Sequence, residues 1–325
     1  MTTLLTGCYT PPMGSGRGVG RLELSDGQLI SHGLVGLTES PSFLIRRGDV
    51  VYAVNEADQG RVTSLRWDGA RLRQLSVQNT GGAHPCHLAI DDSGSVLAVA
   101  NYTGGSVSLH RLAPDGVIMP RFTLLELSGS GPVGDRQDAA HAHQVVFAGS
   151  RLHVVDLGSD RVWRYRLEPD GAAVELAPWA LPPGFGPRQL VLDAEWAYVL
   201  GELSNQLAAF SVTEPGTKPV TVVAAAGREL PAGNLAAALV RPEPGRLLVS
   251  HRGADRITSL RCAGAEVTVT AEYPSVAAWP RELSVVEGMV LVCGQRSDEV
   301  VALAPDGDVV ARVATPNPTC VLALD

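Results

Sequence analysis

Lysine is almost absent from this sequence. Of the 26 Lys and Arg residues among 325, only Lys218 is a lysine. The formal net charge of −8 and the pI near 5.5 do not fit the clustered basic surface of a typical nucleic-acid-binding protein. We therefore expect no nucleic-acid partner. Nearly all positive charge is arginine, whose planar guanidinium binds carboxylate and phosphate groups through two parallel hydrogen bonds.

Long apolar runs and paired cysteines are also missing. No run approaches the ~18 apolar residues of a membrane span, and MTTLLTGCYTPPMG does not read as a signal peptide. We therefore expect a cytoplasmic protein without membrane contact. The number of cysteines is odd and none has CxxC spacing, which argues against a disulfide framework and a structural zinc site. They are Cys8, Cys86, Cys262, Cys293 and Cys320.

What the sequence does contain is a repeat of short β-rich segments, such as VVYAVNE ending at Glu56 and VLAVANY ending at Tyr102. Equivalent positions are Asn55, Asn101, Asp156, Gly201, His251 and Gly294. The steps between them range from 43 to 55 residues, close to the ~40 to 50 residues of one propeller blade. A second apolar segment follows each position after six or seven residues, which predicts a hairpin, and Asp-Gly turns follow several of these.

A third segment precedes each of these hairpins, as in PCHL from Pro85, PRQL from Pro187 and PREL from Pro280. Its seventh copy, PTCV from Pro318, ends the chain, and the matching partner strand is TLLTGCY from Thr3 to Tyr9. The pattern predicts an all-β, seven-bladed β-propeller as a single domain over residues 1–325, with very little helix. Strands from the N- and C-termini would close its last blade and protect otherwise open edges. An irregular β-sandwich explains seven matched copies less well.

Two sets of repeated positions are expected to face the central channel. The residues after the recurring proline are Ser42, Cys86, His143, Arg188, Ala237, Arg281 and Thr319. The residues after the hairpin positions are Tyr9, Glu56, Tyr102, Leu157, Glu202, Arg252 and Gln295. Arginines, a histidine and a carboxylate aimed at one axis are costly unless they meet water or an anion. They predict a concave site for a small anionic molecule that carries a phosphate or carboxylate.

Such a site suits the opening of a lactone ring. Arginines would bind the anionic group and stabilise the oxyanion at the ring carbonyl, while Glu202 or His143 would deprotonate water. The alternative interpretation is structural: His143 and Glu202 would be hydrogen-bonded spacers, and the arginines would pair with carboxylates of the blades.

The segments PCHLAIDDSGSVLAVANYTGGSVSLHRL, HAHQVVF, GPRQLVL, SHRGADRITSL and WPREL resemble the lactonase family of seven-bladed propellers across nearly the whole chain. The resemblance implies a metal-independent lactonase without a cofactor, similar to 6-phosphogluconolactonases and carboxymuconate lactonizing enzymes. It implies catalytic roles for four residues: His143, Arg188, Glu202 and Arg252. Expected substrate-binding residues are Arg281, His87, Glu56, Gln295 and His251.

Three departures from the family pattern affect the substrate: Ala237 replaces an acidic residue, His251 an asparagine and Gln144 a serine. The leading prediction is hydrolysis of a small anionic lactone. A second hypothesis is a lactonizing or cyclising isomerase, and a third is a non-catalytic binding scaffold. We expect a monomer or a weak homo-oligomer.

The sequence has three further features: a pair of histidines, a glycine-rich segment and a long polar segment. The pair His141 and His143 has no third metal ligand at matching spacing. GSGRGVG from Gly14 lacks the ending of a phosphate-binding loop and a following helix, so it reads as an insertion in the closing blade. The polar segment from Gly129 to Ala140 precedes His143, and we treat it as a hypothetical lid.

Overall fold

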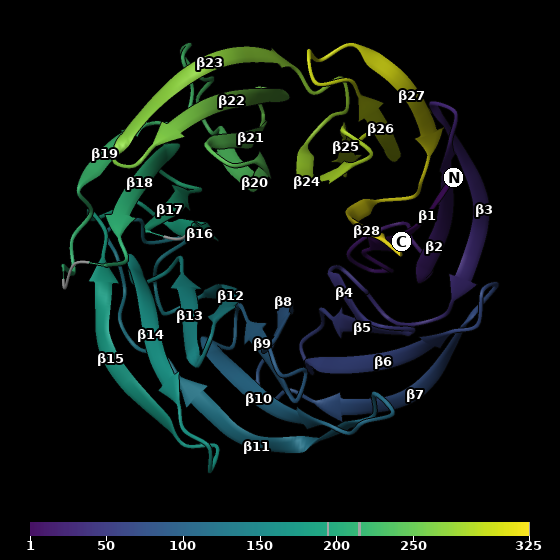
Figure 1. Ribbon diagram of the computed structural model, residues 1–325, viewed down its shortest axis with the longest axis horizontal. Coiled ribbons are helices and arrows are strands. Elements are labelled where there is room, and N and C mark those ends of the chain that lie inside the picture. The colour runs from purple at the N-terminus through teal and green to yellow at the C-terminus, as the bar shows by residue number, and fades with distance from the viewer. Residues whose placement is uncertain (194, 214–215, 325) are drawn as a thin grey trace.

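The structure, a computed structural model, describes residues 1–193, 195–213 and 216–324. Within these ranges the chain forms 28 strands in seven four-stranded antiparallel sheets. The sheets stand around one central axis as the blades of a propeller (Figure 1). None of these residues forms a helix, so the described chain contains no helix long enough to cross a membrane. The prediction of an all-β propeller is confirmed.

The closing blade, from the axis outward, contains β28 (Pro318–Ala323), β1 (Thr2–Cys8), β2 (Val19–Ser25) and β3 (Gln28–Gly36). Blade 1 contains β4 (Leu44–Arg47), β5 (Val50–Asn55), β6 (Arg61–Trp67) and β7 (Leu72–Asn79). Blade 2 contains β8 (Pro85–Ile90), β9 (Val96–Asn101), β10 (Ser106–Leu112) and β11 (Ile118–Glu126). Blade 3 contains β12 (Ala142–Ala148), β13 (Arg151–Asp156), β14 (Arg161–Leu167) and β15 (Ala173–Ala180).

Blade 4 contains β16 (Pro187–Leu192), β17 (Trp196–Gly201), β18 (Gln206–Ser211) and β19 (Thr221–Ala224). Blade 5 contains β20 (Leu235–Glu243), β21 (Arg246–Arg252), β22 (Arg256–Ala263) and β23 (Glu266–Pro274). Blade 6 contains β24 (Pro280–Val286), β25 (Met289–Gly294), β26 (Glu299–Leu303) and β27 (Val309–Ala314).

The position of each strand in its blade explains its composition. Innermost strands such as β8, β16 and β24 begin with proline, which is tolerated because a sheet edge does not need every N–H group. Second strands such as β5 and β9 are buried along their whole length, because neighbouring blades cover both faces. Outermost strands such as β3 are mostly exposed. The hydrophobic core therefore lies between adjacent blades.

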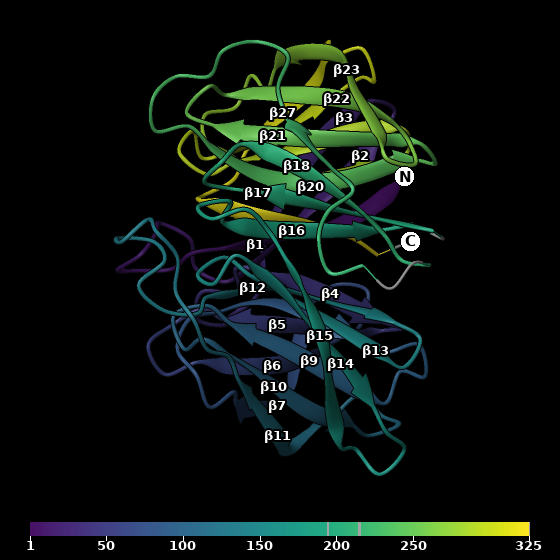
Figure 2. The same ribbon diagram turned by 90° about the vertical axis from the view of Figure 1, so that its left-hand side faces the viewer.

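The ring is closed by strands from opposite ends of the sequence. β1 pairs antiparallel with β28, with Leu5 opposite Leu322. Both ends of the chain accordingly lie close together in the two views (Figures 1 and 2). Leu5 is fully buried in a cluster that also contains Leu44 and Cys320, so the closing blade packs on blade 1. The predicted closure of the last blade is confirmed.

We expect Leu5→Ala to lower the free energy of unfolding by about 2 to 5 kcal/mol, because it leaves a cavity in this closing contact. Leu34→Ala is the control, since Leu34 is 43% exposed on β3 and its loss should change stability by less than about 0.5 kcal/mol. Chemical denaturation of both variants measures the difference. Equal effects would show that the closing contact adds little stability.

Candidate active site

The channel opens into a pocket of about 250 Å³ at the end where the innermost strands begin. Nine residues line it: Tyr9, Glu56, Cys86, Tyr102, Arg136, His143, Glu202, Arg252 and Arg281. Eight of them belong to the two sets of repeated positions predicted from the sequence. Each blade presents the start of its first strand and the end of its second strand to the axis. Residues far apart in the sequence therefore converge here.

Main-chain contacts fix the ends of these strands. Glu202 donates its N–H to the carbonyl of Gly186 at 2.8 Å, and its own carbonyl accepts from the N–H of Ala236 at 3.2 Å. Buried Asp156 accepts the N–H of His141 at 2.7 Å, just before β12. Because backbone and side-chain bonds hold these turns, the pocket side chains project from rigid positions.

Three arginines hold the carboxylate of Glu202. Arg136 Nη2 donates to Oε1 at 2.6 Å, and Arg252 Nη2 lies 2.7 Å from Oε2. Arg188 Nε forms an ion pair with Oε2 at 3.2 Å. Glu202 is only 2% exposed, so these contacts lie in a poorly solvated environment, where they are stronger than at the surface.

This arrangement fixes the ionisation of Glu202. Burial alone would raise the pKa of its carboxyl group, but the positive charges of Arg252, Arg188 and Arg136 outweigh burial and hold the pKa well below its ordinary value. Glu202 is therefore a carboxylate at neutral pH and accepts a proton poorly.

His143 is neutral and faces Arg188. Arg188 Nη1 lies 2.6 Å from Nε2 of the imidazole. A guanidinium has no acceptor, so Nε2 accepts and the ring proton is on Nδ1. Burial, followed by the charge of Arg188, lowers the pKa of His143 well below its usual value. Nδ1 is buried without a hydrogen-bond partner among the described residues.

A second carboxylate, Glu56, belongs to a separate cluster. The Tyr9 hydroxyl donates to Glu56 Oε1 at 2.8 Å, and the Ser42 hydroxyl donates to Oε2. Arg281 Nη2 in turn donates to the Tyr9 oxygen at 2.6 Å and places its guanidinium over the Tyr9 ring. Glu56 is 9% exposed. Its hydrogen-bond donors are hydroxyl groups rather than guanidiniums.

Arg136 is the pocket residue that the sequence analysis missed. It lies outside the repeat, in the loop of residues 129–140. Buried Gln137 fastens this loop by donating to the carbonyl of Leu157 at 2.9 Å and to Asp160 Oδ1 at 2.7 Å. The signal available in the sequence was Arg136 itself, an arginine in the polar loop that precedes His143. The lid hypothesis stays a prediction.

Four residues of the predicted site do not line this pocket. One is Arg188, expected to be catalytic, which is 2% exposed and contacts Glu202 and His143. The other three were expected to bind substrate. His251 is fully buried inside blade 5, where its Nε2 lies 3.1 Å from Thr258 Oγ1. The ring of His87 stacks on Phe43 at 4.2 Å, and burial lowers its pKa to about 3. Gln295 has a buried Oε1 without a partner among the described residues. Ala237, at an equivalent repeated position, is buried and contributes no charge.

The two histidines of the HAH pair have different partners. His141 Nε2 lies 3.0 Å from Asp138 Oδ1, and its ring stacks on Tyr102. His143 instead faces Arg188. Across the part of the chain that the structure describes, no group of three or more His, Cys, Asp or Glu residues is arranged to hold a metal ion.

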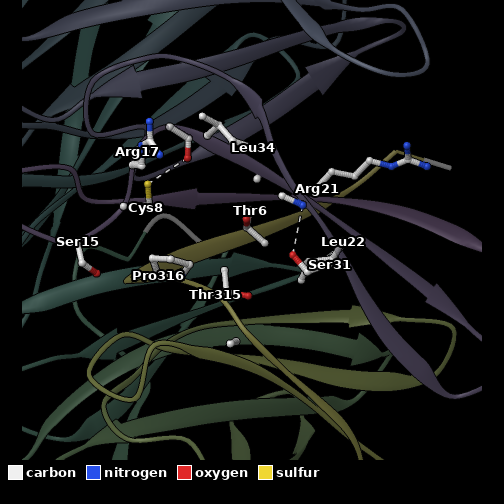
Figure 3. Close-up of a pocket in the computed structure, with 15 residues that line it drawn as sticks. Thr6, Cys8, Ser15, Arg17, Arg21, Leu22, Ser31, Leu34, Thr315 and Pro316 are labelled. Atoms are coloured by element: carbon white, nitrogen blue, oxygen red, sulfur yellow. Dashed lines mark hydrogen bonds between the residues drawn. The ribbon is translucent and has the colours of Figure 1, made fainter.

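Other cavities lie outside the channel. One, of about 190 Å³, is lined by the GSGRGVG segment and by Pro316 between the closing blade and blade 6 (Figure 3). In it the Cys8 thiol donates to the Gly18 carbonyl at 3.1 Å. A larger groove of about 640 Å³ includes Arg136 and Arg228. A further pocket, of about 410 Å³, contains charges of both signs, but its Arg111 and Arg166 are exposed. The channel pocket gathers buried charged groups from several blades, so we take it as the candidate active site.

The chain is similar to several known proteins. Over 296 residues the chain is 27% identical to the 6-phosphogluconolactonase of Bacillus subtilis (strain 168), covering 85% of this chain and 84% of the relative. The solved structure of the periplasmic gluconolactonase of Pseudomonas aeruginosa matches with a TM-score of 0.88 and 29% identity, over 100% of this chain and 99% of that one. A Lactobacillus plantarum protein matches with a TM-score of 0.92 and 27% identity, with complete coverage of both chains.

Residues 3–323 match the protein family described as "Lactonase, 7-bladed beta-propeller". The match spans all seven blades and includes both strands that close the ring. The chain therefore belongs to the lactonase family of seven-bladed β-propellers.

Proposed function

We propose that this protein hydrolyses a small lactone that carries an anionic group, with 6-phosphogluconolactone as the leading substrate. The main support for this proposal is the charge of the channel pocket. Three arginines and two carboxylates line it: Arg136, Arg252 and Arg281, with Glu56 and Glu202. Arg188 does not line the pocket but pairs with Glu202, so the four arginines together exceed the two carboxylates by two formal positive charges. A phosphate monoester, with a charge close to −2 at neutral pH, would balance this excess.

The names of the relatives support the lactone part of the proposal, since two of them are named for 6-phosphogluconolactone or gluconolactone. Hydrolysis of a lactone passes through a tetrahedral intermediate with an oxyanion. Arg252 lines the pocket, and a guanidinium fixed in advance stabilises such a charge without reorganising. In this proposal Arg252 and His143 act at the lactone carbonyl, and Arg136, whose side chain is 33% exposed at the pocket, binds the phosphate. Glu202 holds these arginines and Arg188 in place.

Two further expectations from the sequence stay predictions. The cytoplasmic location is one of them, and the relative from Pseudomonas aeruginosa is described as periplasmic. The other is the monomeric or weakly oligomeric state.

The charge of the pocket also depends on Glu282, which follows Arg281 on β24. Burial raises the pKa of its carboxyl group to about 7, although Arg188 and Arg281 act in the opposite direction. Gln189 Nε2 donates to its Oε2 at 3.4 Å. As the pH rises through 7, Glu282 becomes ionised next to these two arginines and reduces the positive excess.

We predict that the wild-type protein has a higher kcat/KM for 6-phosphogluconolactone than for gluconolactone by about 10-fold or more, because the phosphate adds charge-assisted hydrogen bonds. Arg136→Ala should lower kcat/KM for the phosphorylated lactone by about 10 to 100-fold and reduce the preference. Rates are measured on freshly prepared lactones after subtraction of spontaneous hydrolysis.

Arg228→Ala is the matched control, because Arg228 lies in the neighbouring groove with a side chain that is 75% exposed. It should retain the wild-type preference. Equal rates for both lactones with the wild-type protein would argue against a phosphorylated substrate. Loss of the preference in both arginine variants would argue against a specific role for Arg136.

A second prediction concerns stability and pH. The folded-state pKa of Glu282 is raised from 4.5 to about 7, so its stabilising effect is complete below about pH 4.5 and is lost as the pH rises to about 7. In wild type, Glu282 should therefore lower the free energy of unfolding by up to about 3 kcal/mol between pH 5 and pH 8. Glu282→Gln should lack this decrease. Urea denaturation at both pH values measures this. An identical pH dependence of the two proteins would contradict the assignment.

A further inference from the structure

Hydrolysis of a lactone requires a group that removes a proton from the attacking water. Such a group must reach the pocket, keep a free lone pair and accept a proton readily. Four groups of the pocket wall besides the arginines and tyrosines are candidates: Glu56, Cys86, His143 and Glu202. Their hydrogen bonds and ion pairs show which of them can act as the base.

Glu202 is a poor base in this setting. Both of its oxygens are in contact with guanidiniums, from Arg136 on one and from Arg252 and Arg188 on the other. Opposite charges at this distance stabilise the carboxylate against protonation. A water approaching Glu202 would also have to compete with three charged donors. This carboxylate therefore positions cations.

His143 and Cys86 are also unsuitable. The Nε2 lone pair of His143 is directed at Arg188 Nη1 at 2.6 Å, and its other ring nitrogen carries the proton. The Cys86 thiol is directed at the carbonyl of His143 at 3.3 Å, and burial raises its pKa far above neutrality. Neither side chain offers a basic lone pair to a water molecule in the pocket.

Glu56 differs from these three groups in its contacts. Each of its oxygens accepts one hydroxyl hydrogen bond, from Tyr9 and from Ser42, and a carboxylate oxygen has about two lone-pair sites. No ion pair joins Glu56 to a cation among the residues that the structure describes. Arg281 is connected to it through the Tyr9 hydroxyl, at 2.6 Å and 2.8 Å for the two successive bonds. These two hydrogen bonds orient the Glu56 carboxylate and leave lone pairs on its oxygens free to accept from water.

The two carboxylates also lie in different parts of the ring. Glu56 follows β5 of blade 1, and Glu202 follows β17 of blade 4. These blades stand on opposite sides of the ring (Figure 1). A lactone in the pocket would therefore lie between the arginines around Glu202 and a water molecule held by Glu56. Attack from one side and stabilisation of charge from the other is the arrangement that acyl transfer needs.

We propose that Glu56 is the general base of this active site and that Tyr9 and Ser42 position it; the proposal rests on the lactone hydrolysis proposed above. One Glu56 oxygen takes a proton from water while the water oxygen bonds to the carbonyl carbon. The carbonyl electron pair moves to its oxygen, next to the arginines. The pair then returns, the bond from the carbonyl carbon to the ring oxygen breaks, and that oxygen takes the proton from Glu56. The product is the open hydroxy acid.

The test compares kcat and KM of wild type, Glu56→Gln and Glu56→Asp on 6-phosphogluconolactone. Glu56→Gln should lower kcat by about 10² to 10⁴-fold with little change in KM. Added formate should restore part of the rate, since it supplies a small carboxylate. Glu56→Asp should retain more activity than Glu56→Gln. Thermal unfolding checks that each variant is folded.

The outcomes separate this proposal from the proposed function. No catalysis by folded wild type on either 6-phosphogluconolactone or gluconolactone would overturn the lactonase proposal itself. Wild-type catalysis with an unchanged kcat in Glu56→Gln would overturn the role of Glu56 alone. An increase in KM at constant kcat would also overturn it, because Glu56 would then bind substrate. Ser42→Ala provides a milder test, with a smaller decrease in kcat and no change in KM expected.

Discussion

The contact between Glu202 and three guanidiniums is the interaction on which the rest of the site depends. Arg136, Arg188 and Arg252 come from a loop, from β16 and from β21, and their charges would repel one another without a carboxylate between them. Burying such a group of ions costs desolvation energy, which is recovered only when geometry is good and hydrogen bonds are made. The propeller supplies that geometry, because its blades pack into a closed ring whose ends are fixed by β1 and β28.

The pocket is divided between two electrostatic environments. Around Glu202 the positive charges dominate, and a neutral His143 accepts from Arg188. Near blade 1 and the closing blade, Glu56 is bonded by hydroxyl groups and linked to Arg281 through Tyr9. The same residue type therefore has two different roles, because its neighbours determine whether it accepts protons or holds cations. This division gives a bound anionic lactone one preferred orientation.

Repetition explains how a regular fold produces this unequal pocket. Every blade contributes the same two positions, but several of them carry small or apolar residues such as Ser42, Ala237 and Thr319, all buried. Charged residues at the other copies can then extend into the channel without crowding. The charge of the channel pocket thus depends on which copies carry charged residues, and a loop outside the repeat adds the further charge of Arg136.

The sequence by itself determined the seven blades, the closure by both termini and eight of the nine pocket residues, because the same pattern of strands recurs in every blade and fixes the direction of equivalent positions. It did not determine the contribution of Arg136, which no repeat predicts. Nor did it exclude His251, whose side chain turns into blade 5 because neighbouring residues on a strand alternate between faces. The roles of Glu56 and Glu202 also depend on tertiary structure, since only distances between side chains of different blades reveal that guanidiniums surround one carboxylate and hydroxyl groups the other.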